Sequence, residues 1–326
     1  MREKPHSSSS NSAKQTMPSS SENYVHILQS ELWAKFQESL GKEVLRASHG
    51  HYSYIAVIEK TPVGKYLFVP YGPHLDSQGK LKSAVASLRQ SAKTEHAIFV
   101  RIEPTLHLSE KSLHQMGAKK SKDIDPAETW VVDFPETREQ LLQKLPRRLR
   151  GYYNTHEKKG IEIIKSRTPS DIKHLLKLQK QVFKSKNIKT FSEDYLKKEL
   201  EQDFATLYMA KHRDQIIAAI LVFDDAKTRY YMQAASDKSY AKLNANGIIT
   251  IQAILDAYDK GLRAFDFWGI APDGASKDHP WAGFTAFKKM FDGRPAHYSG
   301  TYDVPVNHFR YLVYKIFRRL NLWLAR

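Results

Sequence analysis

The pattern of apolar and polar positions predicts alternating helices and short strands along most of the chain. Helical spacing predicts helices over residues 32–40, 81–93, 141–159, 171–184, 192–204, 248–260 and 308–326. Runs of β-branched and aromatic residues predict strands over 52–59, 65–69, 97–102, 130–134, 161–165, 206–211, 216–224, 229–235 and 298–303. Each half has a helix, antiparallel strands, a helix and then a strand. This order predicts two related α/β domains.

One stretch near the C-terminal end combines a buried strand with a short aromatic helix. Residues 265–270 (FDFWGI) are typical of a buried strand, and residues 271–276 are rich in residues that break regular structure. A helix is expected from Gly283. Three phenylalanines at helical spacing predict an inward face for this helix: Phe284, Phe287 and Phe291.

Lys288 borders this aromatic face, whereas Lys289 is turned about 100° away toward solvent. A lysine beside aromatic residues, a strand end and a glycine-rich loop are suitable parts of a site for an anionic or carbonyl-bearing ligand. The alternative is a lysine stem that covers apolar surface and has no chemical role. The residues alone leave both interpretations open.

Composition narrows the class of protein. The formal net charge of +16, from 51 Lys and Arg against 35 Asp and Glu, favours a polyanionic partner such as nucleic acid, a nucleotide or an anionic membrane surface. The sequence contains no cysteine, which excludes disulfides, thiol nucleophiles and cysteine-bound zinc. It has neither a membrane-spanning apolar run nor a signal peptide, so we expect a cytoplasmic protein.

Three segments have unusual compositions. Residues 1–22 are serine-rich and lack periodicity, so we expect a disordered tail. The predicted helix at 141–159 is strongly basic, typical either of a solvated face or of an anion-binding surface. The last helix, 308–326, combines basic and aromatic residues. It either docks on the first domain with a charged outer face or lies on an anionic membrane.

Common catalytic and cofactor motifs are absent from the sequence. It contains no Walker loop, no GxGxxG and no HExxH, and His49 and His51 lack a third metal ligand. Residues 242–247 (KLNANG) stand where an acetyl-CoA-binding turn would precede a helix, and they do not match it. We therefore expect neither a metal ion nor acetyl-CoA.

Five short motifs, taken in order, resemble the FemABX family of peptidoglycan aminoacyltransferases. They are residues 32–35 (LWAK), 70–73 (PYGP), 101–104 (RIEP), 266–270 (DFWGI) and 279–288 (HPWAGFTAFK). The resemblance covers nearly the whole chain after residue 22. It implies two GNAT-like domains, each with a mixed, largely antiparallel sheet flanked by helices, in the shorter form without a coiled-coil arm.

The resemblance also implies a domain division. The first GNAT-like domain would comprise residues 23–150 plus 304–326, with the last helix returning to it, and the second would comprise residues 151–303. Members of the family take an amino acid from aminoacyl-tRNA and need no cofactor. They attach it to the stem-peptide amine of a peptidoglycan precursor, either lipid II or UDP-MurNAc-pentapeptide. Peripheral contact with the inner face of the membrane would suit a lipid-borne acceptor.

Site residues follow from the matched positions. Lys35 matches a lysine that contacts the precursor's diphosphate, and Tyr195 matches a tyrosine of the same site. Phe191 stands where shorter members have an arginine. Tyr240 is the candidate for a further tyrosine expected before the helix at 248–260, and Trp268 of the fourth motif is counted with these substrate-binding residues.

Phe287 and Lys288 match a Phe-Lys pair at the reacting aminoacyl ester. A cation there would stabilise the negative charge that develops on the carbonyl oxygen, or it would hold the terminal ribose or phosphate of the tRNA. Two other functions stay open. One is a GNAT-like N-acyltransferase that uses another amine acceptor. The other is a non-catalytic protein that binds tRNA or a membrane.

Overall fold

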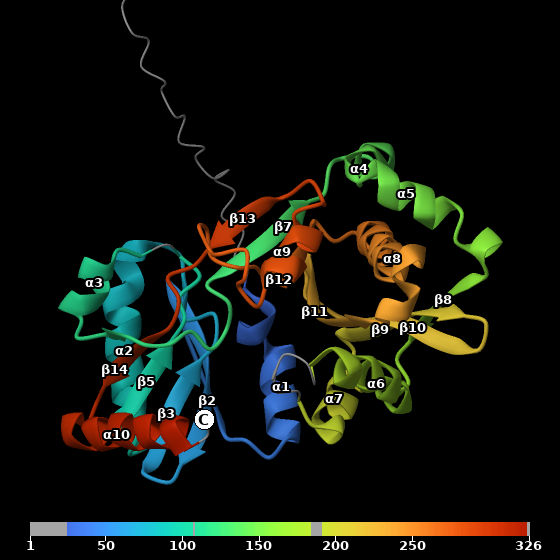
Figure 1. Cartoon of the computed structure of the whole chain (residues 1–326). Coiled ribbons are helices and arrows are strands. Elements are labelled where there is room, and N and C mark those ends of the chain that lie inside the picture. Colours follow the sequence, from blue (N-terminus) through green and yellow to red (C-terminus); the bar gives the residue numbers. More distant parts are fainter. Residues whose placement is uncertain (1–24, 107, 184–190, 325–326) are drawn as a thin grey trace, which may run out of the picture.

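The computed structural model describes residues 25–106, 108–183 and 191–324. Within these residues the chain forms two mixed seven-stranded sheets with helices packed on their faces (Figure 1). The architecture confirms the expected α/β (α+β) class. Residues 1–22, expected to be disordered, lie outside the described residues. No helix in the described part of the chain is both long enough and apolar enough to cross a membrane.

The first sheet combines the N-terminal strands with one strand from near the C-terminal end. Its order is β1-β2-β3-β5-β14-β6, with β4 also paired to β2. Among the pairs in this described sheet, β3 and β5 run parallel, and the others run antiparallel. The strands are β1 (Val44–His49), β2 (Tyr52–Thr61), β3 (Gly64–Val69), β4 (His74–Leu75), β5 (Phe99–Ile102), β6 (Lys119–Lys120) and β14 (Tyr302–Pro305).

The second sheet has the order β13-β7-β12-β11-β10-β9-β8. Here β11 and β12 are parallel, and the other described pairs are antiparallel. The strands are β7 (Glu128–Asp133), β8 (Ile161–Ser166), β9 (Ala205–His212), β10 (Gln215–Asp224), β11 (Thr228–Ser236), β12 (Ala264–Gly269) and β13 (Arg294–His297). The parallel β11–β12 pair requires the crossover helix α8 between its strands.

The helices cover both sheets. α2 and α3 pack on one face of the first sheet and α10 on the other; α4, α5 and α8 pack on one face of the second sheet, and α1, α6 and α7 on the other (Figure 1). The helices are α1 (Glu31–Ser39), α2 (Leu81–Thr94), α3 (Glu110–Gln115), α4 (Arg138–Lys144), α5 (Arg147–Asn154), α6 (Ile172–Phe183), α7 (Glu193–Leu200), α8 (Ala245–Asp259), α9 (Ala282–Lys288) and α10 (His308–Leu324).

α1 connects the two sheets. Its buried residues Trp33 and Phe36 belong to the apolar cluster that α6 and α7 form on the second sheet, although α1 also contacts β1 and β2 of the first. Tyr71, just after β3, enters the same cluster. The two sheets therefore share part of one core, and the candidate site residues Tyr195 and Trp268 pack against it.

The domain boundaries remain a proposal, although the sheets show where the segments near them lie. β7, α4 and the first half of α5 fall within residues 23–150, the range expected for the first domain. β7 nevertheless pairs in the second sheet, and Leu141 and Leu149 pack in its core. β14 returns from the second domain to the first sheet.

Two sequence-based predictions of elements were wrong. The single helix predicted over 141–159 is broken at Leu145, which is extended because the following Pro146 disfavours helical geometry. The strand predicted over 298–303 is displaced. β13 ends at His297, and the left-handed Gly300 (φ 73°) precedes the start of β14 at Tyr302.

A buried ion pair holds the returning C-terminal segment. Arg101 of β5 donates to Asp303 of β14 through Nε and Nη2, over 2.7 and 3.0 Å. Both side chains are almost fully buried. The Tyr311 hydroxyl of α10 also donates to Asp303, over 3.0 Å. One buried carboxylate thus connects β5, β14 and α10.

Candidate active site

The end of β12 is shaped by a buried aspartate. One oxygen of the Asp266 carboxylate accepts the Trp268 N–H over 2.7 Å, and the other accepts the Thr129 hydroxyl of β7 over 3.1 Å. Aspartate commonly bonds the main chain two residues on, which stabilises turns. Trp268 has a left-handed backbone (φ 61°), and the pairing with β7 shifts register between Asp266 and Gly269. This turn positions Gly269.

Lys288 lies at the end of α9 and is only 9% exposed. Its Nζ donates to the Gly269 carbonyl oxygen over 2.6 Å. Burial lowers the pKa of Lys288 to about 8, partly opposed by the negative charge of Asp266. Burial in turn raises the pKa of Asp266 to about 6. Near neutral pH the lysine therefore carries its charge in a poorly hydrated place, where it would interact strongly with an oxyanion.

Gly269 is required by close packing. A Cβ at this position would lie 2.6 Å from Pro126 Cγ and 3.2 Å from Trp281 Cζ3. The Trp281 ring therefore lies next to the carbonyl-bearing residue that Lys288 contacts. The connecting loop is fixed on α9 because the Ala271 N–H donates to the Thr285 hydroxyl over 2.8 Å.

Phe287 is half-buried and packs against the core of the second sheet. Its ring meets Phe267 at 6.5 Å and Phe291 at 5.6 Å between centroids. Phe284, predicted to share this inward face, is instead 37% exposed, and α9 ends at Lys288, before Phe291. Lys289 is exposed as expected and lies 3.7 Å from Asp273.

Trp268 belongs to an aromatic cluster at the junction of the two sheets. Its ring lies 5.2 Å from Tyr71, 5.6 Å from His26 and 5.9 Å from Tyr230. Burial lowers the pKa of His26 to about 3, so this imidazole is neutral at physiological pH. The turn thus connects Lys288 to the contact between the domains.

Lys35 and Tyr195 lie on neighbouring helices. Tyr195 is half-buried on α7, where the Ser192 N-cap confirms the predicted helix start, and its ring packs edge-on against Phe36 of α1 at 5.5 Å. Phe191 stacks on Tyr195 at 4.8 Å. Lys35, which precedes Phe36 in α1, is exposed. The two residues thus belong to one junction between helices, without a direct contact in the described structure.

Glu199 lies beneath this junction, one turn after Tyr195. It is 4% exposed and hydrogen-bonds the Tyr195 hydroxyl. Burial raises the pKa of Glu199 to about 8. Glu199 could not be recognised from the sequence, because a buried glutamate in an amphipathic helix has no pattern that separates it from solvated ones.

Tyr240 lies at the β9–β10 hairpin. It belongs to a short 3-10 helix (Lys238–Leu243), donates to Gln215 over 3.1 Å and meets the edge of His212 at 5.8 Å. These contacts do not join it to Lys288 or to the junction between α1 and α7. The structure therefore does not assemble all predicted site residues around one point.

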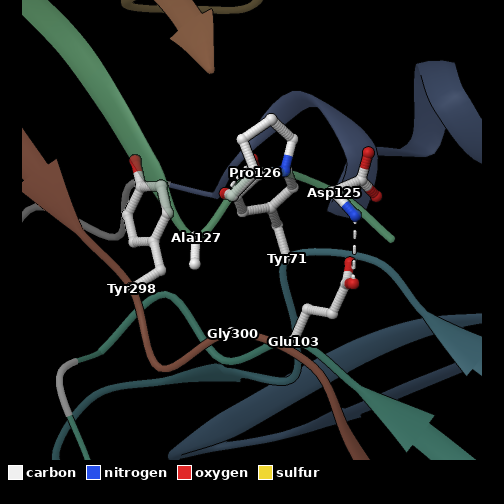
Figure 2. Close-up of a pocket in the computed structure, with 7 residues that line it drawn as sticks. All are labelled: Tyr71, Glu103, Asp125, Pro126, Ala127, Tyr298 and Gly300. Atoms are coloured by element: carbon white, nitrogen blue, oxygen red, sulfur yellow. Dashed lines mark hydrogen bonds between the residues drawn. The ribbon is translucent and has the colours of Figure 1, made fainter. Parts of the chain in front are cut away.

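A small pocket between the sheets contains residues that the sequence analysis did not select (Figure 2). Its acidic members are Glu103, at the end of β5, and Asp125. Glu103 accepts the Asp125 N–H over 3.2 Å and the Thr301 hydroxyl over 2.5 Å. The lining residues are Tyr71, Glu103, Asp125, Pro126, Ala127, Tyr298 and Gly300.

Burial and mutual repulsion raise the pKa of Asp125 well above its usual value, and burial raises that of Glu103. The hydrogen bond between the two residues runs from the Asp125 main-chain N–H to Glu103, so the two acidic groups are held near each other. Pro126 separates this pair from Gly269, so a proton-binding group adjoins the Lys288 site. In the sequence, Glu103 stands in the RIEP motif (residues 101–104). Asp125 has no comparable signal, because it lies at the end of a loop that contains both basic and acidic residues.

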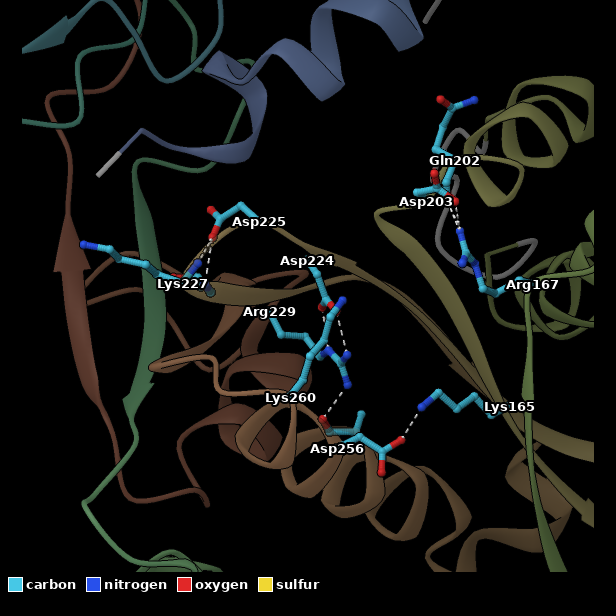
Figure 3. A network of polar contacts seen from close by, with 12 residues as sticks. Lys165, Arg167, Gln202, Asp203, Asp224, Asp225, Lys227, Arg229, Asp256 and Lys260 are labelled. Atoms are coloured by element: carbon cyan, nitrogen blue, oxygen red, sulfur yellow. Dashed lines mark hydrogen bonds and ion pairs between the residues drawn. The ribbon is translucent and has the colours of Figure 1, made fainter. Parts of the chain in front are cut away.

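A second cluster of charged residues stabilises the packing of α8 on the second sheet (Figure 3). Arg229 donates to both oxygens of Asp224, over 2.6 and 2.7 Å, and to the Ala253 carbonyl of α8 over 2.8 Å. Lys260 also pairs with Asp224, over 2.9 Å. These contacts hold α8 on the second sheet. In the part of the chain that the structure describes, no cluster of three or more His, Asp or Glu could hold a metal ion.

Comparisons with known proteins agree with this architecture. The model of the FemAB family matches residues 197–319, which include β12, α9 and Lys288. The crystal structure of FemX superposes with a TM-score of 0.75 at 18% identity, over 88% of this chain and 94% of that one.

Two other solved structures share the fold less closely. The structure of L-PGS from Bacillus licheniformis gives a TM-score of 0.54 at 16% identity, covering 91% of this chain and 97% of the other. The C-terminal domain (DUF2156) of a putative lysylphosphatidylglycerol synthetase from Agrobacterium fabrum gives 0.55 at 14% identity, covering 85% and 87%. Comparison with curated protein sequences gave no significant match.

The two sheets with their crossover helices define a protein with paired GNAT-like domains. Residues 197–319 are thus similar to the FemAB family, and the fold of the chain is similar to that of FemX.

Proposed function

We propose that this protein is an aminoacyltransferase. It moves an amino acid from aminoacyl-tRNA to the stem-peptide amine of a peptidoglycan precursor, lipid II or UDP-MurNAc-pentapeptide, and so builds the interpeptide bridge. The observation that carries the proposal is the buried Lys288 ammonium on the Gly269 carbonyl, within the segment that matches the FemAB family.

The reaction joins an amine to an ester carbonyl and releases the ribose hydroxyl of the tRNA. Negative charge develops on the carbonyl oxygen during the attack. An ammonium has three N–H donors, and Gly269 occupies one of those of Lys288. The other two would stabilise the oxyanion in surroundings of low hydration. Phe287, packed on Phe267, shapes the apolar wall beside it.

The remaining predicted residues would bind the elongated acceptor. Lys35 would contact the diphosphate by charge, with Tyr195 beside it on α7. Trp268 lies nearer the reacting end, next to Gly269. Because the stem-peptide amine and the diphosphate are far apart in the precursor, separate contacts for the two ends are expected. Tyr240, which contacts the β9–β10 hairpin, would bind a further part of a substrate.

The net charge of +16 suits both a tRNA and a diphosphate-bearing precursor. Use of aminoacyl-tRNA places the proposed reaction in the cytoplasm. No metal ion, acetyl-CoA or other cofactor takes part in the proposed chemistry.

The test is transfer of labelled amino acids from a mixed pool of charged tRNA. A lysine-containing precursor is supplied in UDP-linked and, separately, in lipid-linked form. We expect labelled product on at least one of them, and the label then identifies the donated amino acid. Acetyl-CoA with the same acceptors serves as the control donor and is expected to give no product.

Two outcomes would contradict the proposal. Acetyl transfer from acetyl-CoA, without transfer from tRNA, would support an N-acyltransferase with another amine acceptor. Binding of tRNA without transfer to either precursor would support a non-catalytic binding protein.

A further inference from the structure

α10 has two apolar faces, and only one of them is packed. Tyr311 and Tyr314 are buried against Ile98 and Phe99 of the first sheet. Five other apolar side chains of the same helix face solvent. They are Phe309 (76% exposed), Leu312 (57%), Val313 (38%), Ile316 (51%) and Leu320 (54%).

These five residues form one continuous stripe, which we call the α10 stripe. Their spacing places them within about 100° of arc, because each helical residue advances about 100°. Tyr311 and Tyr314 lie on the opposite side. A helix docked on a domain normally turns polar residues outward. The outer face of α10 is instead apolar, which differs from the charged outer face expected of a docked helix and agrees with the membrane interpretation of this helix.

The helix cannot rotate to bury the α10 stripe, because its inner face is fixed by specific contacts. The Tyr311 hydroxyl donates to the buried Asp303 over 3.0 Å, and the Tyr311 ring packs edge-on against Phe99 at 5.2 Å. Tyr314 also packs on Phe99, at 4.8 Å. The α10 stripe is therefore presented to the outside by a fixed support.

Charge determines which partner fits. Residues 308–324 include Arg310, Lys315, Arg318 and Arg319 and no acidic residue. At 100° per residue, Arg310 and Arg319 border the α10 stripe on opposite sides. An apolar band between basic residues is typical of a helix that lies in the interface of an anionic bilayer. A second copy of this chain would bring like charges together, since the whole protein is strongly basic.

We infer that α10 is an interfacial helix by which the protein binds an anionic lipid surface, with the α10 stripe inserted among the acyl chains and the arginines on the headgroups. This binding does not depend on the reaction proposed above. In Figure 1, α10 lies on the first sheet, well separated from α9 and the Lys288 site. A bilayer under α10 therefore leaves α9 accessible to a tRNA.

The test is co-sedimentation of the full chain with vesicles of phosphatidylcholine alone or of phosphatidylcholine mixed with phosphatidylglycerol. We expect binding to the mixed vesicles that is at least about tenfold tighter than to the neutral ones and that weakens as salt is added. The double variant Phe309→Ser/Ile316→Ser should lose about tenfold or more of this affinity.

Ile124→Ser is the matched control, because Ile124 is 50% exposed and Ile316 is 51% exposed. It should bind vesicles as the unchanged protein does. Thermal unfolding checks that both variants fold, which is expected because the replaced side chains face outward. Equal binding to neutral vesicles, or unchanged binding by the double variant, would overturn the inference. So would a dimer in solution that dissociates in the double variant, because the stripe would then bind a second copy.

Discussion

Lys288 and Gly269 are joined by a 2.6 Å hydrogen bond from the ammonium to the main-chain carbonyl. The bond connects the end of α9 to the end of β12. It holds the charge of a long, flexible side chain at one place, with the Asp266 carboxylate as its electrostatic partner. We propose that this fixed cation stabilises the oxyanion during aminoacyl transfer.

The rate of transfer should depend on the charge of Lys288. Because burial lowers the pKa of Lys288 to about 8, the cation is lost as pH rises through that value. At lower pH, protonation of the acceptor amine slows the reaction. Single-turnover rates measured across pH should therefore rise, pass through a maximum and fall above about pH 8. A rate that keeps rising well above pH 9 would contradict a catalytic role for the charge.

Replacement of Asp266 by asparagine should move the falling limb to lower pH. Asp266→Asn keeps an oxygen that can accept the Trp268 N–H but removes the negative charge that raises the pKa of Lys288. The measurement is the same pH series of single-turnover rates. If the rate of the variant falls over the same pH range as that of the unchanged protein, Lys288 is not the group whose titration causes the fall.

The same variant has a second readout in stability. The pKa of Asp266 is raised in the folded protein from 3.8 to about 6, so the folded state binds this proton more tightly than the unfolded state. The contribution of Asp266 to the free energy of unfolding is therefore most favourable at low pH and decreases as pH rises from about 4 to about 6. Denaturant unfolding should show a weaker decrease over this range for Asp266→Asn.

Much of the fold could be predicted from the sequence because its elements have strong local patterns. The helix at α1 and the β2–β3 hairpin follow from apolar periodicity and turn residues. The break at Pro146 was missed because a basic amphipathic pattern continues across it. The exposure of Phe284 was missed because helical spacing places residues on a face without showing how much of that face the rest of the chain covers.

The candidate site was less predictable because its properties depend on distant contacts. The burial of Lys288 depends on Gly269 and on the turn that Asp266 forms with Thr129 of β7. The pairing of Glu103 with Asp125 joins segments that no local pattern relates. The apolar outer face of α10 could not be predicted from the sequence, because only the fold shows that Tyr311 and Tyr314 form its inner face.

Loss of the Arg101–Asp303 pair should destabilise the first domain strongly. Arg101→Met leaves the Asp303 carboxylate buried with one fewer positive partner, so we expect a loss of about 3–5 kcal/mol in the free energy of unfolding. Arg138→Met breaks the exposed pair with Asp259 and should cost less than about 1 kcal/mol. Chemical denaturation measures both. If the two variants lost equal free energy of unfolding, burial would not explain the contribution of the Arg101–Asp303 pair.

The central claim is that Lys288 acts in the transfer step. The direct measurement is the single-turnover rate of aminoacyl transfer by Lys288→Ala, with tRNA affinity measured in parallel. Lys289→Ala, at the exposed neighbouring position, is the control. We expect a rate about 10²–10³ lower for Lys288→Ala with tRNA binding retained, and a near-normal rate for Lys289→Ala. A normal rate for Lys288→Ala, or a defect confined to tRNA binding, would contradict this claim.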